Sequence, residues 1–104
     1  MPTSKPSFII TVLLWVREGR ESQFDRYEQK AITIMAGYGG RLETAILVES
    51  ATSEQPPTQI HVLKFPNAKA FEKYRNDAEL LSLQEERRAC IEHTEVYAGL
   101  QNIQ

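Results

Sequence analysis

The chain has 104 residues, of which 41% are hydrophobic and 25% are charged, and its formal net charge is −2. The length fits one domain, and the composition excludes an intrinsically disordered chain. Lysines and arginines are scattered, which excludes the clustered positive surface that nucleic-acid binding needs. No stretch of the sequence approaches the roughly 20 apolar residues of a membrane span. We therefore expect a single domain without a nucleic-acid or membrane partner.

Residues 1–7 contain two prolines and are interpreted as a flexible leader, so the expected domain covers residues 8–104. Phe8–Val16 is apolar and rich in β-branched residues, which predicts a buried strand. Residues 21–36 follow as a predicted helix, because apolar residues recur there with a period of 3.6. That stripe consists of Phe24, Tyr27, Ala31, Ile34, Met35 and Tyr38.

The helix is expected to end at Gly39-Gly40, since a left-handed position after a helix favours glycine. Two further strands are predicted at Arg41–Ser50 and Thr58–Phe65, separated by a loop that ends in two prolines. A second helical stretch begins after Asn67, which can cap it, and is expected to break at Asp77. Its helical spacing continues to Ile91, and the last strand is predicted at Thr94–Leu100.

This order of elements, β-α-β-β-α-β, matches the ferredoxin-like motif of the α+β class. It predicts a four-stranded antiparallel sheet with the helices on one face. Because side chains alternate along a strand, each strand contributes to both faces. The set expected beneath the helices is almost wholly aliphatic: Ile10, Val12, Leu14, Leu42, Ile46, Val48, Ile60, Val62, Val96 and Ala98.

The opposite, helix-free face is expected to mix large apolar groups with polar ones. Its predicted members are Thr11, Leu13, Trp15, Glu43, Ala45, Leu47, Gln59, His61, Leu63, Phe65, Glu95 and Tyr97. Such a patch, several hundred Å² in area, is at the upper limit for soluble monomers. We therefore expect a homodimer in which two sheets pack face to face and enclose a ligand pocket bordered by His61.

The sequence resembles the dimeric α/β-barrel superfamily, and within it the family named domain of unknown function 1330. The resemblance rests on Gly39-Gly40-Arg41 after the first helix and on VLKFP, which ends at Phe65-Pro66. Tyr74, Glu79 and Arg87 match later positions, although the Ser-Pro-Tyr residues typical of that region are absent. The resemblance implies the barrel fold and no settled activity. The wider superfamily includes cofactor-independent monooxygenases, small isomerases and haem-binding proteins, which are analogies only.

Two interpretations are open for most candidate site residues. His61 is a general base, or a core or interface histidine whose ring bonds to Glu43 or Tyr97. Tyr97 donates to a substrate oxygen, or is a tyrosine that simply finds a partner. Trp15 stacks on a planar ligand or packs in the interface, and Glu43 either fixes the tautomer of His61 or lies in water at a strand end.

Arg41 is interpreted as an anion-binding residue at the pocket mouth or as a solvated arginine. Thr11 and Phe65 are assigned to the same pocket. Arg87 lies on the apolar stripe of the last helix, where it extends to water or pairs with glutamates, with a substrate role as the alternative.

Metal and redox chemistry find little support in the composition. Cys90 is the only cysteine and cannot form an intrachain disulfide, which favours the cytoplasm. The histidines, His61 and His93, are far apart, so we predict no metal site and no cofactor. A haem bound through His61 is left open because one imidazole suffices.

Three functional hypotheses follow from the sequence. The first is a homodimer that binds a small, partly aromatic or carbonyl-bearing molecule, either in a pocket on the helix-free face inside the barrel or between the sheet and the helix layer. The second is a cofactor-independent monooxygenase or isomerase that acts on a phenolic or enolic substrate, with His61 and Tyr97 as catalytic residues. The third is a structural or regulatory dimer without a ligand.

Overall fold

The computed structural model describes residues 6–102 and contains four strands and four helices. The expected leader, residues 1–7, therefore lies mostly outside the described residues. The order is β-α-β-β-α-β as predicted, with the second helical stretch divided into three short helices. The elements are β1 (Phe8–Val16), α1 (Glu21–Ala36), β2 (Arg41–Leu47), β3 (Gln59–Phe65), α2 (Ala68–Arg75), α3 (Ala78–Ser82), α4 (Gln84–Cys90) and β4 (Ile91–Leu100).

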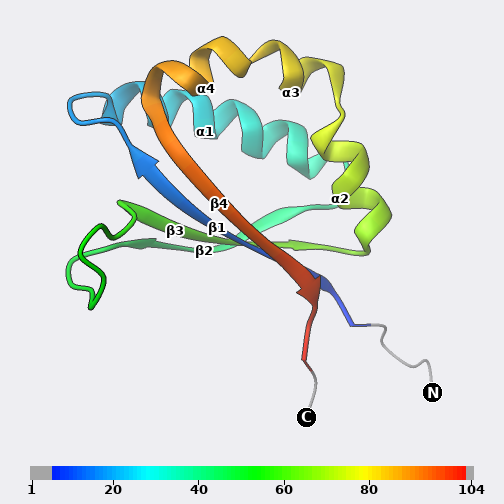
Figure 1. Cartoon of the computed structure of the whole chain (residues 1–104). Coiled ribbons are helices and arrows are strands. Elements are labelled where there is room, and N and C mark those ends of the chain that lie inside the picture. Colours follow the sequence, from blue (N-terminus) through cyan, green and yellow to red (C-terminus); the bar gives the residue numbers. More distant parts are fainter. Residues whose placement is uncertain (1–5, 103–104) are drawn as a thin grey trace.

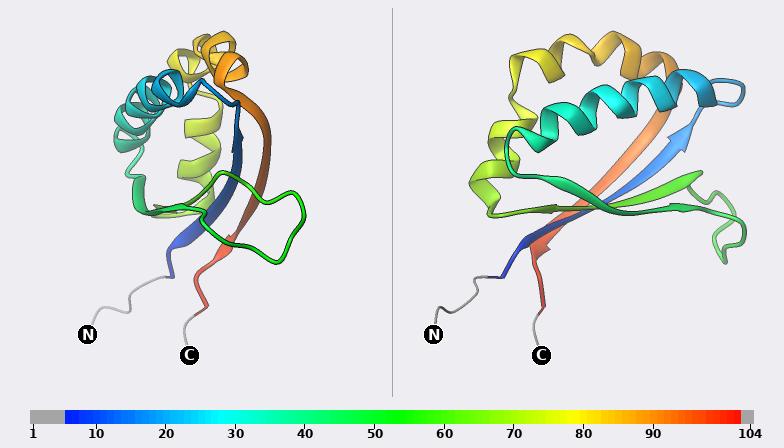
Figure 2. Two further views of the ribbon diagram at one scale, coloured as in Figure 1. Left: turned by 90° about the vertical axis from the view of Figure 1, so that its left-hand side faces the viewer. Right: turned by 180° about the vertical axis from the view of Figure 1, so that it is seen from behind.

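The strands form one antiparallel sheet in the order β2-β3-β1-β4, and the helices cover one of its faces (Figure 1). Seen from its edge, the sheet curves strongly beneath the helices (Figure 2). The α+β ferredoxin-like fold predicted from the sequence is thereby confirmed.

Local sequence signals explain where the helices begin and end. Gly39, with φ of +77°, occupies the left-handed position expected after α1. The side chain of Asn67 accepts a hydrogen bond from the backbone N–H of Ala70 at 2.8 Å, and Asp77 accepts one from Leu80 at 3.0 Å. These caps begin α2 and α3, so the helical stretch changes direction at Asp77 as predicted.

The last strand begins three residues earlier than predicted. Ile91 follows α4 directly, is buried, and pairs with Val16 of β1. The helical spacing that extended to Ile91 was therefore misleading, because the buried side of a helix and the buried side of the following strand both demand apolar residues. A register shift between Trp15 and Val16 accommodates this early start.

The expected face of β3 was wrong. His61 pairs with Val12 and Leu63 pairs with Ile10, and residues directly opposite each other in an antiparallel pair share a face. Because Ile10 is fully buried beneath the helices, this side of β3 faces the helices too. The residues moved from the helix-free face to the helix-covered face are Gln59, His61, Leu63 and Phe65.

The β2 strand also changes phase along its length. Its register shifts between Leu42 and Thr44, so Glu43 is an extra residue that inverts the alternation beyond it. Ala45 pairs with His61 and therefore joins the helix-covered side, whereas Ile46 pairs with Ile60 on the helix-free side. The sequence analysis had placed Ile46 on the helix-covered face and Ala45 on the helix-free face. Leu47, which pairs with Gln59, lies on the helix-covered side together with Ala45.

The core lies between the sheet and the helices in two neighbouring clusters. Cys90 belongs to the first and is fully buried, where it packs as a small hydrophobic residue. The first cluster consists of Leu14, Phe24, Tyr27, Ala31, Leu83, Cys90 and Ile91, and the second of Ile10, Met35, Phe65 and Phe71.

Candidate functional site

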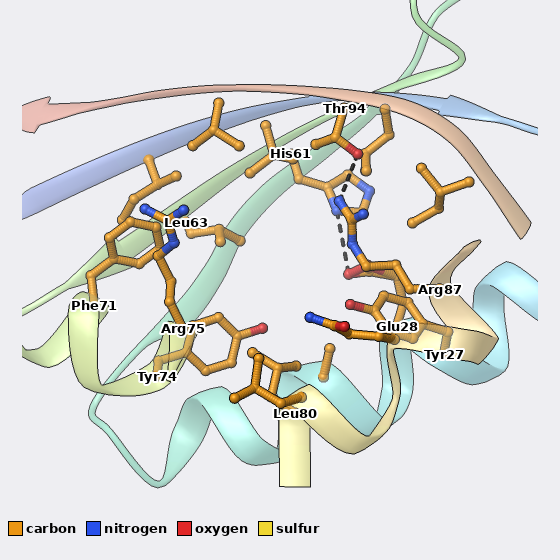
Figure 3. A pocket seen from close by; sticks show the side chains of 18 of the residues that line it. Tyr27, Glu28, His61, Leu63, Phe71, Tyr74, Arg75, Leu80, Arg87 and Thr94 are labelled. Atoms are coloured by element: carbon orange, nitrogen blue, oxygen red, sulfur yellow. Dashed lines mark hydrogen bonds and ion pairs between the residues drawn. The ribbon is translucent and has the colours of Figure 1, made fainter. Parts of the chain in front are cut away.

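A cavity of about 390 Å³ lies between the sheet and the helix layer, at the boundary of the two core clusters (Figure 3). The sheet supplies one wall, which is mostly aliphatic, and the helices supply the other, which carries the tyrosines and arginines. The sheet residues are Ile10, Val12, Leu14, His61, Leu63, Ile91, Thr94 and Val96. The helix residues are Tyr27, Glu28, Ala31, Phe71, Tyr74, Arg75, Leu80, Leu81, Gln84, Arg87 and Arg88.

His61 is the one buried polar residue of the described core, with 4% of its surface exposed. Its Nε2 lies 2.8 Å from Oε1 of Gln59, its neighbour on the same face of β3. Its Nδ1 lies 3.6 Å from Oε1 of Glu28, which extends from α1. The imidazole is thus held between strand and helix, with a carboxylate behind one nitrogen, an arrangement that can fix the tautomer of the ring.

Arg87 projects from α4 into the same cavity. Its Nη2 donates a hydrogen bond to Oγ1 of Thr94 at 2.6 Å, and its charge also acts on the neighbouring Tyr27. Among the described residues, no carboxylate oxygen lies within 4.0 Å of its guanidinium. The half-buried cation therefore has only neutral oxygens as its protein partners.

Two tyrosines border the cavity as protonated phenols. Burial raises the pKa of Tyr27, an effect that Arg87 partly offsets, and burial likewise raises the pKa of Tyr74 well above its ordinary value. The Tyr74 hydroxyl points into the cavity in Figure 3. Both hydroxyls are consequently available as hydrogen-bond donors throughout the physiological pH range.

The other two arginines lie at the edges of the cavity. The guanidinium of Arg75 lies 5.5 Å from the centre of the Phe71 ring, within cation–π range. Arg88 is largely exposed, and its Nη1 lies 3.7 Å from Oε1 of Glu85. The cavity lining thus carries three arginines and a single glutamate, which gives it a positive character.

Of the seven site residues proposed from sequence, only His61 lines the cavity. Phe65 is 1% exposed and packs against Phe71 and Tyr74 in the core behind the cavity wall. The remaining five lie on the helix-free side of the sheet: Thr11, Trp15, Arg41, Glu43 and Tyr97.

Tyr97 and His61 lie on opposite faces, so the joint site expected from sequence does not exist within one chain. Tyr97 is 61% exposed and donates a hydrogen bond to Glu95 at 3.0 Å. The oxygens expected to hold the His61 ring, those of Glu43 or Tyr97, are replaced by those of Glu28 and Gln59.

Trp15 and Arg41 have local partners. The indole Nε1 of Trp15 donates to the backbone oxygen of Gln55 at 3.2 Å, and its ring lies 4.9 Å from that of His93. Arg41 lies 2.7 Å from Glu43, which is itself 3.9 Å from Lys64. Thr11 pairs with Tyr97 in the register of β1 and β4.

Glu28 is the site residue that sequence reasoning missed. It lies four residues after Phe24 and three before Ala31, which places it on the apolar stripe of α1. A carboxylate among buried positions was therefore a readable signal. Tyr74 was matched through the family resemblance and Arg87 was placed on the apolar stripe of the last helix, but their convergence with His61 depended on the correct phase of β3.

A haem held through His61 does not fit this geometry, because Glu28 and Gln59 already engage both ring nitrogens. Within residues 6–102, no group of three or more His, Cys, Asp or Glu side chains is arranged to hold a metal ion. None of the helices described is long and apolar enough to cross a membrane.

Comparison with known proteins gives a family match and several similar folds. Residues 8–98 match the family model described as Domain of unknown function (DUF1330). No curated protein matches the chain significantly. The structure is similar to RPA0582, a protein of unknown function from Rhodopseudomonas palustris, with a TM-score of 0.83 and 12% identity over 96% of this chain and 85% of that one.

Two further solved structures share the fold. A NIPSNAP family protein from Agrobacterium tumefaciens has a TM-score of 0.71 and 16% identity over 98% of this chain and 91% of that one. A DABB family protein with a ferredoxin-like fold, from Mesorhizobium loti, has a TM-score of 0.70 and 13% identity over 94% and 99% of the two chains. Identities this low establish a common fold alone.

Proposed function

The chain belongs to the family described as Domain of unknown function (DUF1330), and we propose that it binds a small molecule in the cavity between its sheet and its helices. The observation that carries this proposal is the cavity itself, at whose lining His61, Arg87 and Tyr74 converge. A volume of about 390 Å³ falls within the range of ligand pockets, which are mostly apolar with a few placed polar groups. An open cavity also argues against the third hypothesis, a purely structural dimer.

Binding can be tested by NMR titration with one-ring probes supplied in matched acid and amide forms: benzoate and benzamide, and phenylacetate and phenylacetamide. We expect at least one probe to shift the backbone amide resonances of His61 and Leu63 at millimolar concentration. Val96→Trp should fill the cavity from the edge strand and abolish these shifts, whereas Tyr97→Trp, one residue along and on the opposite face, should preserve them. If none of the four probes produces a shift that Val96→Trp abolishes, the proposed function is wrong.

We also propose that the protein is a homodimer joined through its helix-free face. The correction to β3 still leaves large apolar residues on this face, because Ile60 and Val62 replace His61 and Leu63 there. Trp15 and Leu13 are only partly covered, and Ile46 is 47% exposed. A stable dimer buries about 800 Å² per partner, and a face of this kind is suited to supply it.

Light scattering coupled to size exclusion tests the dimer. The wild type is expected to elute with twice the chain mass at micromolar concentration, and Ile60→Lys should yield a folded monomer. Lys69→Glu, on the exposed side of α2, is the control that should leave the mass unchanged. A monomeric wild type would end the dimer proposal without affecting the cavity.

We keep the proposal of a cytoplasmic location, because the single cysteine, Cys90, is a free thiol buried in the core.

The placement of Glu28 behind His61 favours one second candidate, a cofactor-independent monooxygenase or isomerase acting on an enolic or phenolic substrate. In it, the side chain of Gln59 turns away from Nε2 of His61, which then removes a proton from carbon, and Tyr74 takes over the donor role first assigned to Tyr97. Phenylpyruvate in D2O is a suitable probe, since a proton lost to His61 is replaced by a deuteron from solvent. Exchange should exceed that of buffer and of His61→Ala; equal rates in all three samples would contradict the enzyme.

A further inference from the structure

We propose that the cavity is selective for small organic acids, whose oxyanion binds at Arg87 while an apolar body lies against the sheet. This inference rests on the proposed function and specifies its ligand class. It follows from the unequal charges of the lining, from the hydroxyl donors beside Arg87 and from the apolar character of the opposite wall.

The first argument concerns Arg87, which is charged at every physiological pH. It is half-buried, and within the described part of the chain its side chain donates a hydrogen bond to the hydroxyl of Thr94, while its charge partly offsets the raised pKa of the neighbouring Tyr27. A partly desolvated guanidinium without an anion is costly, and a carboxylate or enolate that accepts two of its N–H groups relieves that cost. The position where an anion is most strongly stabilised is therefore the cavity side of Arg87.

The second argument is that Glu28, the carboxylate in the cavity lining, is paired with His61 and not with Arg87. Glu28 directs its Oε1 toward Nδ1 of His61 at 3.6 Å, and its side chain is only 19% exposed. Arg75 is stacked on Phe71, and Arg88 lies beside Glu85 at the rim. With three arginines and one glutamate in the lining, the potential at the cavity centre favours a ligand with at least one negative charge.

The third argument concerns the donors around the site. Burial keeps Tyr27 and Tyr74 protonated, so that each offers an O–H rather than a repelling phenolate. Figure 3 shows the Tyr74 hydroxyl pointing into the cavity and the Arg87 side chain extending across it to Thr94 on the sheet. A guanidinium and phenols that border one cavity form a donor set matched to an oxyanion, and they offer no comparable acceptor set to a cationic ligand.

The fourth argument sets the body of the ligand. Away from His61 and Thr94, the sheet wall is formed by Ile10, Val12 and Leu63 with the ring of Phe71 at one end, and these side chains provide no polar atom for a hydrophilic substituent. Such a wall favours a planar or alicyclic hydrocarbon body over a sugar or a polyphosphate. The cavity volume lies near the lower limit of ligand pockets and suits a single ring.

The matched acid and amide probes separate this inference from the proposed function. Each pair has nearly the same shape and differs in charge, so the ratio of the two dissociation constants isolates the oxyanion. We expect the acids to bind about 10- to 100-fold more tightly than their amides at low salt, the usual range for a charge-assisted hydrogen bond. Arg87→Gln should remove most of that ratio, and Arg87→Lys should restore part of it.

Arg26→Gln is the matched control, since it removes the same charge from an exposed position of α1 outside the cavity. It should leave the ratio within about twofold of the wild-type value. Equal binding of acids and amides by the wild type overturns the inference while preserving the proposed function. An acid preference that persists in Arg87→Gln, or that is lost equally in Arg26→Gln, overturns the assignment to Arg87. Thermal unfolding of each variant establishes that the comparison is made between folded proteins.

Discussion

Replacing Gly40 by alanine should destabilise the fold at the corner between α1 and β2. A Cβ atom at Gly40 would lie 2.5 Å from both Cε1 and Cζ of Phe65 and 2.6 Å from Cγ of Met35. Carbon atoms in favourable contact are about 3.5–4.0 Å apart, so the neighbouring groups must retreat by about 1 Å. The added methyl group therefore tests how tightly the core behind the cavity is packed.

The neighbours have little room to retreat. Phe65 and Met35 are each 1% exposed, and the Phe65 ring lies 5.3 Å from that of Phe71 and 5.5 Å from that of Tyr74. Overpacking of this kind costs about 1–3 kcal/mol, and the lower entropy of the unfolded alanine chain offsets about 0.4–1 kcal/mol. We expect a net loss of about 1.3 kcal/mol, which for a domain of this size lowers Tm by about 5–10 °C.

Urea denaturation followed by tryptophan fluorescence and thermal unfolding followed by circular dichroism measure the effect. Gly99→Ala is the control, because a Cβ there meets no atom within 4 Å and φ is not in the left-handed region. Alanine in that strand position should be neutral or stabilising by up to about 1 kcal/mol. The packing argument fails if Gly40→Ala changes the free energy of unfolding by less than about 0.5 kcal/mol, or if both variants shift alike.

Three further predictions follow from the titratable groups. The Tyr38 hydroxyl and the N–H of Leu80 hold the pKa of Asp77 below its ordinary value, so this group's stabilisation is complete above about pH 4 and is lost as pH falls further. Asp77→Asn should flatten the acid limb of a urea-denaturation profile, and an unchanged limb would contradict the assignment. Burial raises the pKa of Tyr74, so the stability that its buried, protonated hydroxyl supports is present below about pH 10 and is lost as pH rises further. Tyr74→Phe should therefore weaken the fall of Tm at alkaline pH, and identical Tm curves for the two proteins would contradict this assignment. Burial also raises the pKa of Cys90, which should therefore react with a disulfide reagent only as fast as the fold opens, whereas rapid labelling of native protein would refute its burial.

The parts of the fold that depend on short-range patterns were readable from the sequence. The stripe of α1 from Phe24 to Met35, the glycines that end it and the caps at Asn67 and Asp77 each concern residues within one or two turns. Their physical causes, amphipathic burial and satisfaction of helix-end N–H groups, act locally. The order of elements followed from them.

The candidate site was less predictable because it depends on register. Both faces of β3 are apolar, with Ile60 and Val62 on one and Leu63 and Phe65 on the other, so alternation alone does not reveal which is buried. A one-residue error in phase moves every side chain to the other face. In β2 a similar inversion arises from the extra residue Glu43, and single-sequence periodicity does not locate such a bulge.

The alternation of side chains along β3 separates the two roles proposed for this chain, ligand binding and dimerisation. His61 and Ile60 are adjacent, and the pleat of β3 directs the first toward the helices and the second toward the helix-free side. A partner that covers Ile60 therefore supplies no atom to the cavity, and a ligand beside His61 touches no part of the dimer interface. Coupling between dimerisation and ligand binding therefore requires a movement of the whole β3 strand, because the side chains of Ile60 and His61 are connected only through the backbone. The sequence-based view, in which dimerisation itself built the chamber, is thus replaced by a cavity that each chain contains by itself.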